Sequence, residues 1–250
     1  MTKGYHDKSR QLLRISGSDR QSFLQGLVSN DVTRLAEGPI YAALLSAQGK
    51  YLFDFFLAAD GDGILLDVAA ERAPALAQRL GMYRLRAEVA IEADERPVWR
   101  GIGDQPEHAF TDPRHEAMGW RHYGTLETEP LSEAYFEALR VEHIIPGPEL
   151  VENETYILEA GFERLNGVDF RKGCYVGQEI TARMKHKTEL KKGLGRVSIT
   201  GDALFGAPIT AGGKPAGTLF TVLEGRGLAH LRFDRAKGDM QAGAATLRLD

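Results

Sequence analysis

The spacing of hydrophobic and polar positions changes along the chain, and it begins with a helical repeat. Within FLQGLVSNDV the apolar residues recur three and four positions apart, which predicts a helix over 18–28. Ser18, followed three residues later by Gln21, has the spacing of a capping box at the start of this helix.

Residues 40–70 have a different texture, with three apolar runs separated by short glycine turns. The runs are IYAALLS, YLFDFFLAAD and ILLDVAA, and the turns are AQGK and GDG. Such a pattern predicts a meander of three strands. A helix is expected over 70–80, with Pro74 tolerated in its first turn. The alternating YRLRAEVAIE that follows predicts another strand, so the first hundred residues are mixed α and β.

The rest of the chain divides into an irregular part and a glycine-punctuated part. Residues 96–130 are rich in Pro, Gly, His and Asp, which indicates irregular connections or short strands, and 132–143 regain helical spacing. From Gly193 onward, glycines separate short alternating segments such as GRVSIT and LAHLRF, which is typical of a small β-barrel or sandwich. We therefore predict an α+β protein with units at 1–95, 96–192 and 193–250.

Composition narrows the class of protein. A hydrophobic content of 43% can bury an ordinary core, and a net charge of -4 does not favour a polyanionic partner for the whole molecule. The single cysteine excludes an internal disulfide framework and a zinc site built from several thiolates, and it fits a reducing compartment. With neither an apolar signal segment nor a run of about 18 apolar residues, we expect a cytoplasmic protein and no membrane partner.

Cys174 is the first candidate for chemistry because it lies in the polar, flexible segment RKGCYVGQE. Gly173 and Gly177 free the backbone on both sides, and the cation of Lys172, two residues away, favours the thiolate. The alternative is a small buried hydrophobic residue, which a lone cysteine often is. A single thiolate cannot complete an iron-sulfur or zinc site, so we expect no resident metal, and a metal role needs ligands from a partner.

Asp54 is the second candidate because it interrupts the apolar strand YLFDFFLAA. By strand alternation it shares a face with Leu52 and Phe56, and both faces of the strand look buried. A buried carboxylate needs a cation, backbone N–H groups or a ligand that presents donors. Internal satisfaction and a heterocycle with adjacent N–H donors both remain open on this pattern.

A basic cluster is the third feature, and it could bind an anionic cofactor tail or a phosphate backbone. A solvated surface is the other interpretation. The cluster contains Arg183, Lys185, His186, Lys187, Lys191, Lys192 and Arg196.

The segment ILEAGFERLNGVDFRKGCYVGQEITAR resembles the signature of the YgfZ-like folate-binding proteins, whose motif Lys-Gly-Cys-Tyr/Phe-x-Gly-Gln-Glu is complete here. Mitochondrial relatives that act in iron-sulfur protein maturation carry a similar segment. The wider superfamily includes the T protein of glycine cleavage, a tetrahydrofolate-dependent aminomethyltransferase. The stretches FLQGLVSNDVTRL, AQGKYLFDFFL and YRLRAEV also look like this superfamily, so the resemblance spans most of the chain.

The resemblance implies a ring-like arrangement of mixed α/β folate-binding units followed by a C-terminal β-barrel, with tetrahydrofolate or a derivative in the centre. Asp54 matches the carboxylate that the aminomethyltransferases direct at the folate, and Glu149 in GPEL matches their pterin-contacting glutamate. The motif itself carries over as Lys172, Cys174, Tyr175, Gln178 and Glu179, and its final candidate contact, Arg183, matches a basic position just beyond it. The T proteins lack the Lys-Gly-Cys core, which argues against simple glycine cleavage here.

Three functions follow from these features. The first is a folate-binding accessory protein for assembly or repair of iron-sulfur proteins, with an indirect effect on tRNA modification, Cys174 as redox or cluster-contacting thiol and Lys172 as its electrostatic activator. The second is a folate-dependent aminomethyl or one-carbon transferase, so whether the protein is an enzyme stays open. The third is an RNA-binding module that uses the basic cluster. The first is preferred, with folate and iron-sulfur client or assembly proteins as partners and no direct nucleic-acid partner.

Overall fold

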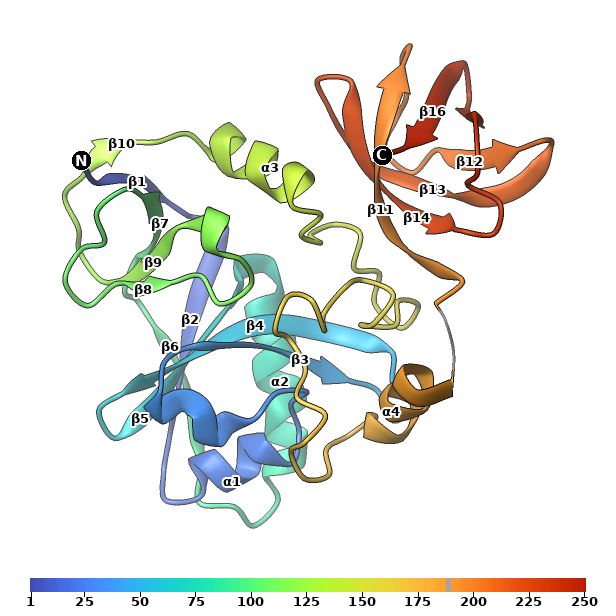
Figure 1. Cartoon of the computed structure of the whole chain (residues 1–250). Coiled ribbons are helices and arrows are strands. Elements are labelled where there is room, and N and C mark those ends of the chain that lie inside the picture. Colours follow the sequence, from blue (N-terminus) through green and yellow to red (C-terminus); the bar gives the residue numbers. More distant parts are fainter. Residues whose placement is uncertain (188–189) are drawn as a thin grey trace.

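The computed structural model describes residues 1–187 and 190–250, apart from the side chain of Lys187. Within these described residues the strands form two five-stranded sheets and a closed six-stranded barrel, and Figure 1 shows the barrel set apart from the sheets, beyond α3 and α4. The predicted α+β class is confirmed, including the C-terminal barrel.

The first sheet has the strand order β3-β4-β5-β2-β6, and every neighbouring pair is antiparallel. The predicted meander is confirmed within it, because three successive strands pair through the two glycine turns. The strand predicted from YRLRAEVAIE begins later, since its first residues continue the preceding helix. The strands are β2 (Arg10–Ser16), β3 (Ile40–Leu45), β4 (Tyr51–Asp60), β5 (Gly63–Ala69) and β6 (Ala90–Asp94).

Helices cover one face of this sheet and bury its larger apolar core. They are α1 (Arg20–Gln25), η1 (Val32–Ala36), η2 (Ala70–Arg72) and α2 (Ala73–Arg84). Pro74 lies in the first turn of α2, as predicted. The predicted capping box is wrong: Asp19 caps α1 without a side-chain bond, while the Ser18 hydroxyl donates to Glu88 Oε2 at 2.8 Å. A long-range partner therefore replaced the local one.

Both faces of β4 are covered, but a β-bulge changes which residues share a face. Phe53 and Phe55 lie in the core beneath the helices, and Phe56 lies in the opposite core, as predicted. Leu52 lies with Phe53 rather than with Asp54, because the register shifts by one residue opposite the β3 residues Leu44 and Leu45. Tyr51 takes the predicted place of Leu52 on the other face.

The second sheet, β10-β1-β7-β9-β8, is built from the segment predicted to be irregular or to form short strands. Its first strand comes from the N-terminus, so residues 3–6 pair outside the predicted unit 1–95. Helix α3 (Glu133–Glu142) follows, and the Ser132 hydroxyl caps it by accepting from Tyr135 N at 3.3 Å. The strands are β1 (Lys3–His6), β7 (Val98–Ile102), β8 (Phe110–Thr111), β9 (Trp120–Tyr123) and β10 (Glu129–Pro130). The 3₁₀ turn η3 (Glu116–Met118) precedes β9.

A buried charge network joins the two sheets. The Asp67 carboxylate on β5 is inaccessible to solvent and accepts from Arg10 at 2.7 Å, from Arg121 at 2.5 Å and from the Tyr123 hydroxyl at 3.0 Å. The Arg121 guanidinium also lies 4.0 Å from the centre of the Phe56 ring. Because Arg121 and Tyr123 belong to β9, Asp67 connects one sheet to the other.

The barrel closes in the order β11-β14-β13-β12-β15-β16, with β16 paired back to β11. Helix α4 (Gln178–Lys187) precedes it in the chain. The strands are β11 (Lys192–Thr200), β12 (Pro208–Ala211), β13 (Lys214–Leu223), β14 (Arg226–Arg232), β15 (Met240–Ala242) and β16 (Ala245–Leu249). In the part of the chain that the structure describes, no helix has both the length and the apolar character needed to span a membrane.

Candidate functional site

Residues 171–177, here called the thiol loop, are anchored to the protein interior by the Lys172 side chain. Its ammonium group is buried and donates to the carbonyl oxygens of Gln25 at 2.8 Å, Val28 at 2.6 Å and Asn30 at 2.9 Å. Three acceptors match the three N–H groups of an ammonium ion. Burial lowers the pKa of Lys172 to about 8, against the attraction of nearby carboxylates. Lys172 thus fastens the loop to the end of α1, and its predicted role as activator of the thiol stays a prediction.

The second half of the thiol loop is held by the packing of Tyr175 and by the close backbone approach at Gly177. The Tyr175 ring is buried in the core between sheet and loops, where burial raises its pKa to about 12. Gly177 has φ +83°, and a Cβ built there would lie 2.6 Å from the carbonyl oxygen of Ser46. The turn at Ser46 and Gly49 between β3 and β4 therefore requires glycine at position 177.

Between these two anchors the Cys174 side chain is exposed to solvent. Its neighbour Gly173 is also exposed, and no atom lies within 4 Å of a Cβ built there. The side chains of Lys172 and Tyr175 are buried, whereas Gly173 and Cys174 are exposed, so the thiol is accessible from solvent. The alternative of a small buried hydrophobic residue is excluded for Cys174.

A polar network that sequence reasoning missed orients the irregular segment leading into the thiol loop. The Ser29 hydroxyl donates to Gly167 O at 2.6 Å, and the Asn30 amide donates to Asn166 O at 2.7 Å. The Asp169 carboxylate then accepts from Arg171 N at 2.7 Å. The available signal was a Ser-Asn-Asp run between apolar residues, whose polar side chains must find partners when buried.

The other motif residues lie on α4 at the surface. Gln178 is its first residue and is half-buried. Glu179 is exposed and accepts from Arg183 at 2.8 Å, an exposed pair one helical turn apart. The basic cluster is spread over α4 and the start of β11, with Lys185 paired to Glu163 and Arg196 to Asp250. The Lys187 side chain lies outside the described residues.

Asp54 is half-buried on the face of β4 that packs against the core containing Tyr175. Its two oxygens accept from the hydroxyls of Tyr41 and Tyr51, each at 2.8 Å. Burial and the Asp54 charge raise the pKa of both tyrosines, which keeps them neutral donors. Each carboxylate oxygen has a second lone pair, so these contacts leave acceptor capacity for the N–H groups of a heterocycle. The carboxylate of Asp54 can therefore accept hydrogen bonds from the N–H groups of a pterin.

Glu149 lies elsewhere, in a closed network that joins the α3 region to the barrel. Its side chain is fully buried and accepts from Arg140 at 2.8 Å, from Gly147 N at 2.8 Å and from the Thr221 hydroxyl on β13. Glu149 is inaccessible to solvent, so a folate contact there requires this network to open. Asp54 bonds to two tyrosines of the core that contains Tyr175, whereas Glu149 bonds to Arg140, Gly147 and Thr221.

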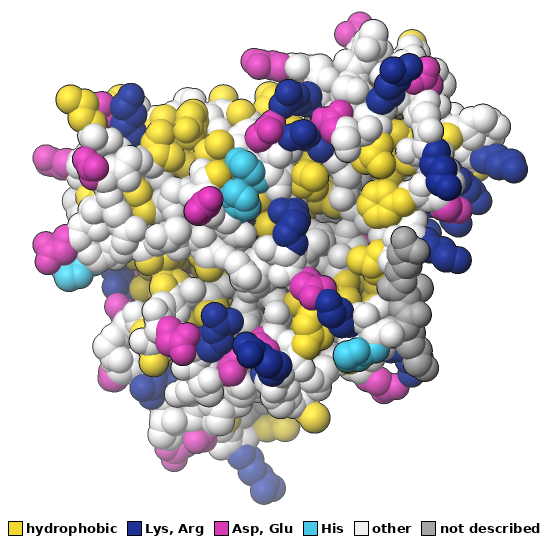
Figure 2. All heavy atoms as spheres, in the orientation of Figure 1, with side chains coloured by type: hydrophobic (Ala, Val, Ile, Leu, Met, Phe, Trp, Pro, Cys, Tyr) yellow, Lys and Arg dark blue, Asp and Glu magenta, His cyan; other side chains and the backbone are white. Residues whose placement is uncertain are grey.

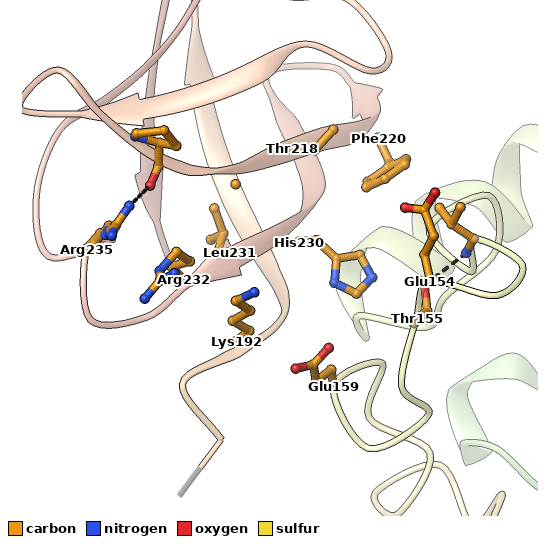
Figure 3. A pocket seen from close by; sticks show the side chains of 13 residues that line it. Glu154, Thr155, Glu159, Lys192, Thr218, Phe220, His230, Leu231, Arg232 and Arg235 are labelled. Atoms are coloured by element: carbon orange, nitrogen blue, oxygen red, sulfur yellow. Dashed lines mark hydrogen bonds between the residues drawn. The ribbon is translucent and has the colours of Figure 1, made fainter. Parts of the chain in front are cut away.

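A cavity of about 380 Å³ lies between the barrel and residues 151–159 (Figure 3). Neither Cys174 nor Asp54 lines it. Residues on its walls come from β11, β13 and β14 on one side and from the 151–159 segment on the other.

Comparison with known proteins places this geometry in context. Residues 191–250 match the family described as CAF17, C-terminal beta-barrel domain. The iron-sulfur cluster assembly factor IBA57 of Homo sapiens is 30% identical over 94% of this chain and 79% of its own length. The homologue of Pyricularia oryzae is 32% identical over 74% of this chain, and the match covers 54% of that protein. The chain thus spans about half the length of the fungal relatives it matches.

The fold has a solved counterpart in the glycine cleavage system aminomethyltransferase T of Bartonella henselae. The two share a TM-score of 0.78 at 14% sequence identity, over 98% of this chain and 84% of the other. This likeness shows the fold alone. The resemblance to the mitochondrial iron-sulfur relatives is confirmed by the sequence matches. The chain, with its complete thiol motif and C-terminal barrel, therefore belongs to the family of the iron-sulfur cluster assembly factor IBA57.

Proposed function

We propose that this protein acts in the assembly or repair of iron-sulfur proteins, with Cys174 as the thiol that contacts the cluster or its client. The observation that carries the proposal is the exposure of the only cysteine on a loop fixed at both ends. Relatives that are named iron-sulfur cluster assembly factors support it. Among the described residues no three His, Cys, Asp or Glu side chains are grouped as a metal site, so a cluster handled at Cys174 takes its other ligands from a partner.

Loss of the thiol is expected to abolish this function without affecting the fold. In a strain that lacks the gene, the activities of iron-sulfur enzymes should fall, and wild-type protein should restore them while Cys174→Ser does not. Ser198→Ala, an exposed polar change in the barrel, is the matched control and should restore them fully. Normal enzyme activities in the deletion strain, or full rescue by Cys174→Ser, would remove the role proposed for the thiol.

We further propose that the protein binds tetrahydrofolate at Asp54. The support is that the half-buried Asp54 carboxylate accepts from two neutral tyrosines of the core that contains Tyr175. Its oxygens retain lone pairs that can accept further hydrogen bonds. When bound, the folate would supply one-carbon or redox chemistry. Asp54 would accept its N–H groups, and Tyr41 and Tyr51 would fix the orientation of the carboxylate.

Asp54→Asn is expected to weaken tetrahydrofolate binding at least tenfold, because the amide replaces an acceptor with a donor facing the pterin N–H groups. Isothermal titration of the purified protein measures the change. Asp62→Asn, in the exposed turn between β4 and β5, is the control and should leave the affinity unchanged. Equal affinity of the two variants would remove Asp54 from the folate site.

Other details of this function also remain proposals. An effect on tRNA modification would arise indirectly, through iron-sulfur enzymes that modify tRNA. A cytoplasmic location rests on the single cysteine of the sequence, whereas the named relatives are mitochondrial. Transferase activity has no observation of its own beyond the shared fold.

A further inference from the structure

The cavity between the barrel and residues 151–159 is lined by cations and carboxylates, and Lys192 lies beside Glu159. Figure 3 shows Lys192, Arg232 and Arg235 on the barrel side, and Glu154 and Glu159 on the side of the 151–159 segment. Figure 2 shows several Lys and Arg side chains on the barrel side of the molecule, on the right of the view. A ligand that spans the cavity would meet Arg232 and Arg235 at one end and Glu154 at the other, with Lys192 and Glu159 between them.

The middle of the cavity has an aromatic wall. Phe220 on β13 and His230 on β14 meet edge to face, with ring centres 5.8 Å apart. His230 Nε2 lies 3.1 Å from the carbonyl oxygen of Glu149, so this nitrogen carries the proton and Nδ1 is an acceptor. Burial lowers the pKa of His230, which keeps the ring neutral. A planar ring could pack against this wall.

The carboxylate end contains a half-buried acid. Burial raises the pKa of Glu159, although Lys192 and Lys50 oppose the shift. Its neighbour Glu154 is exposed at the rim. A carboxylate that is partly removed from water gains most from a ligand that donates N–H groups, and the exocyclic amine of a nucleobase is such a donor.

We propose that this cavity binds a mononucleotide whose base carries an exocyclic amine. The phosphate lies against Arg232 and Arg235, the base packs against Phe220 and His230, and the amine faces Glu154 and Glu159. A volume of about 380 Å³ accommodates a ligand of this class. The site is separate from Cys174 and Asp54, so it is a second binding function of the protein.

Isothermal titration of the purified full chain with AMP tests the proposal. We expect AMP to bind, adenosine to bind about tenfold more weakly, and the AMP affinity to fall with added salt because the phosphate meets two arginines. Arg232→Ala and Phe220→Ala should each weaken AMP binding about tenfold. Arg226→Ala and Val222→Ala, exposed positions on the same two strands outside the cavity wall, are the matched controls and should bind as wild type does.

The base is tested with IMP, which has a carbonyl oxygen in place of the amine of AMP. The wild type should prefer AMP about tenfold, and the double variant Glu154→Gln/Glu159→Gln should lose this preference because amides can also donate. Absence of AMP binding at millimolar concentration, or unchanged binding by Arg232→Ala and Phe220→Ala, overturns the proposal. Tighter binding of 4-aminobenzoyl-glutamate than of AMP, or of a five-residue oligoadenylate than of AMP, also overturns it, by assigning the cavity to a folate tail or to an RNA strand.

Discussion

Replacing Asp67 with asparagine is expected to lower the free energy of unfolding by about 3–5 kcal/mol, the largest effect of any change considered for this protein. Burial alone would raise the pKa of Asp67, but Arg10 and Arg121 outweigh it and hold the pKa below its usual value. The variant keeps the side-chain volume but leaves half-buried Arg10 without its carboxylate partner and buried Arg121 with only Asp112, at 3.5 Å. Urea unfolding followed by circular dichroism measures the loss.

Asp62→Asn is the matched control, because Asp62 pairs with Arg14 in an exposed turn. Its effect should stay within about 0.5 kcal/mol. The contribution of Asp67 in the wild type is present above its unfolded pKa of about 4 and is lost as pH falls through the lower folded value. Unfolding curves of Asp67→Asn and Asp62→Asn that coincide at pH 7 would show that Asp67 does not hold the two sheets together.

Lys172→Met is expected to lower the free energy of unfolding by about 3 kcal/mol, because three buried carbonyl oxygens lose a charged donor. The methionine side chain fills a similar space but cannot bond to Gln25, Val28 or Asn30. Hydrogen exchange should show faster exchange of backbone amides in the thiol loop and around residue 28, ahead of the barrel. Lys185→Met, at the surface pair with Glu163, is the control and should change stability by less than about 0.5 kcal/mol.

The pH dependence gives a second measurement for Lys172. The folded protein loses this proton near pH 8, whereas the unfolded chain loses it near its ordinary pKa of about 10.4. Between these values the folded state binds fewer protons, so this group makes folding more favourable as pH rises. The wild type should therefore gain stability relative to Lys172→Met from pH 8 to 10. A constant difference would contradict the buried, pKa-lowered ammonium.

The elements that the sequence predicted well were those with strong local patterns. The meander of 40–70, the helix capped by Ser132 and the glycine-punctuated barrel depended on alternation and turn residues, which act over a few positions. The prediction failed at Ser18, where a partner 70 residues away competed with the local cap, and at Leu52, where a bulge shifted the alternation. A single inserted residue moves the side chains beyond it to the opposite face of the strand, and the local sequence pattern does not predict this bulge.

The candidate site divides in the same way. Asp54 was identified because a carboxylate interrupts an apolar strand, yet Asp67 in ILLDVAA carried the same signal and became the joint between the sheets. Whether such a carboxylate meets tyrosines or arginines depends on which side chains fold against it. Asp54 bonds to Tyr41 on β3 and to Tyr51 on its own strand, whereas Asp67 bonds to Arg10 on β2 and to Arg121 on β9 of the other sheet.

By itself the sequence determined the fold class, the family and the segment that carries the thiol. The motif is contiguous, so its glycines and its lysine can be recognised without knowing the fold. Only the tertiary structure decided that Lys172 points away from solvent and that Cys174 remains exposed. It also decided that Glu149 is buried and bonded to Arg140 and to Thr221 of the barrel. Side-chain direction depends on carbonyls and cations that arrive from distant segments, and these meet only when the chain is packed.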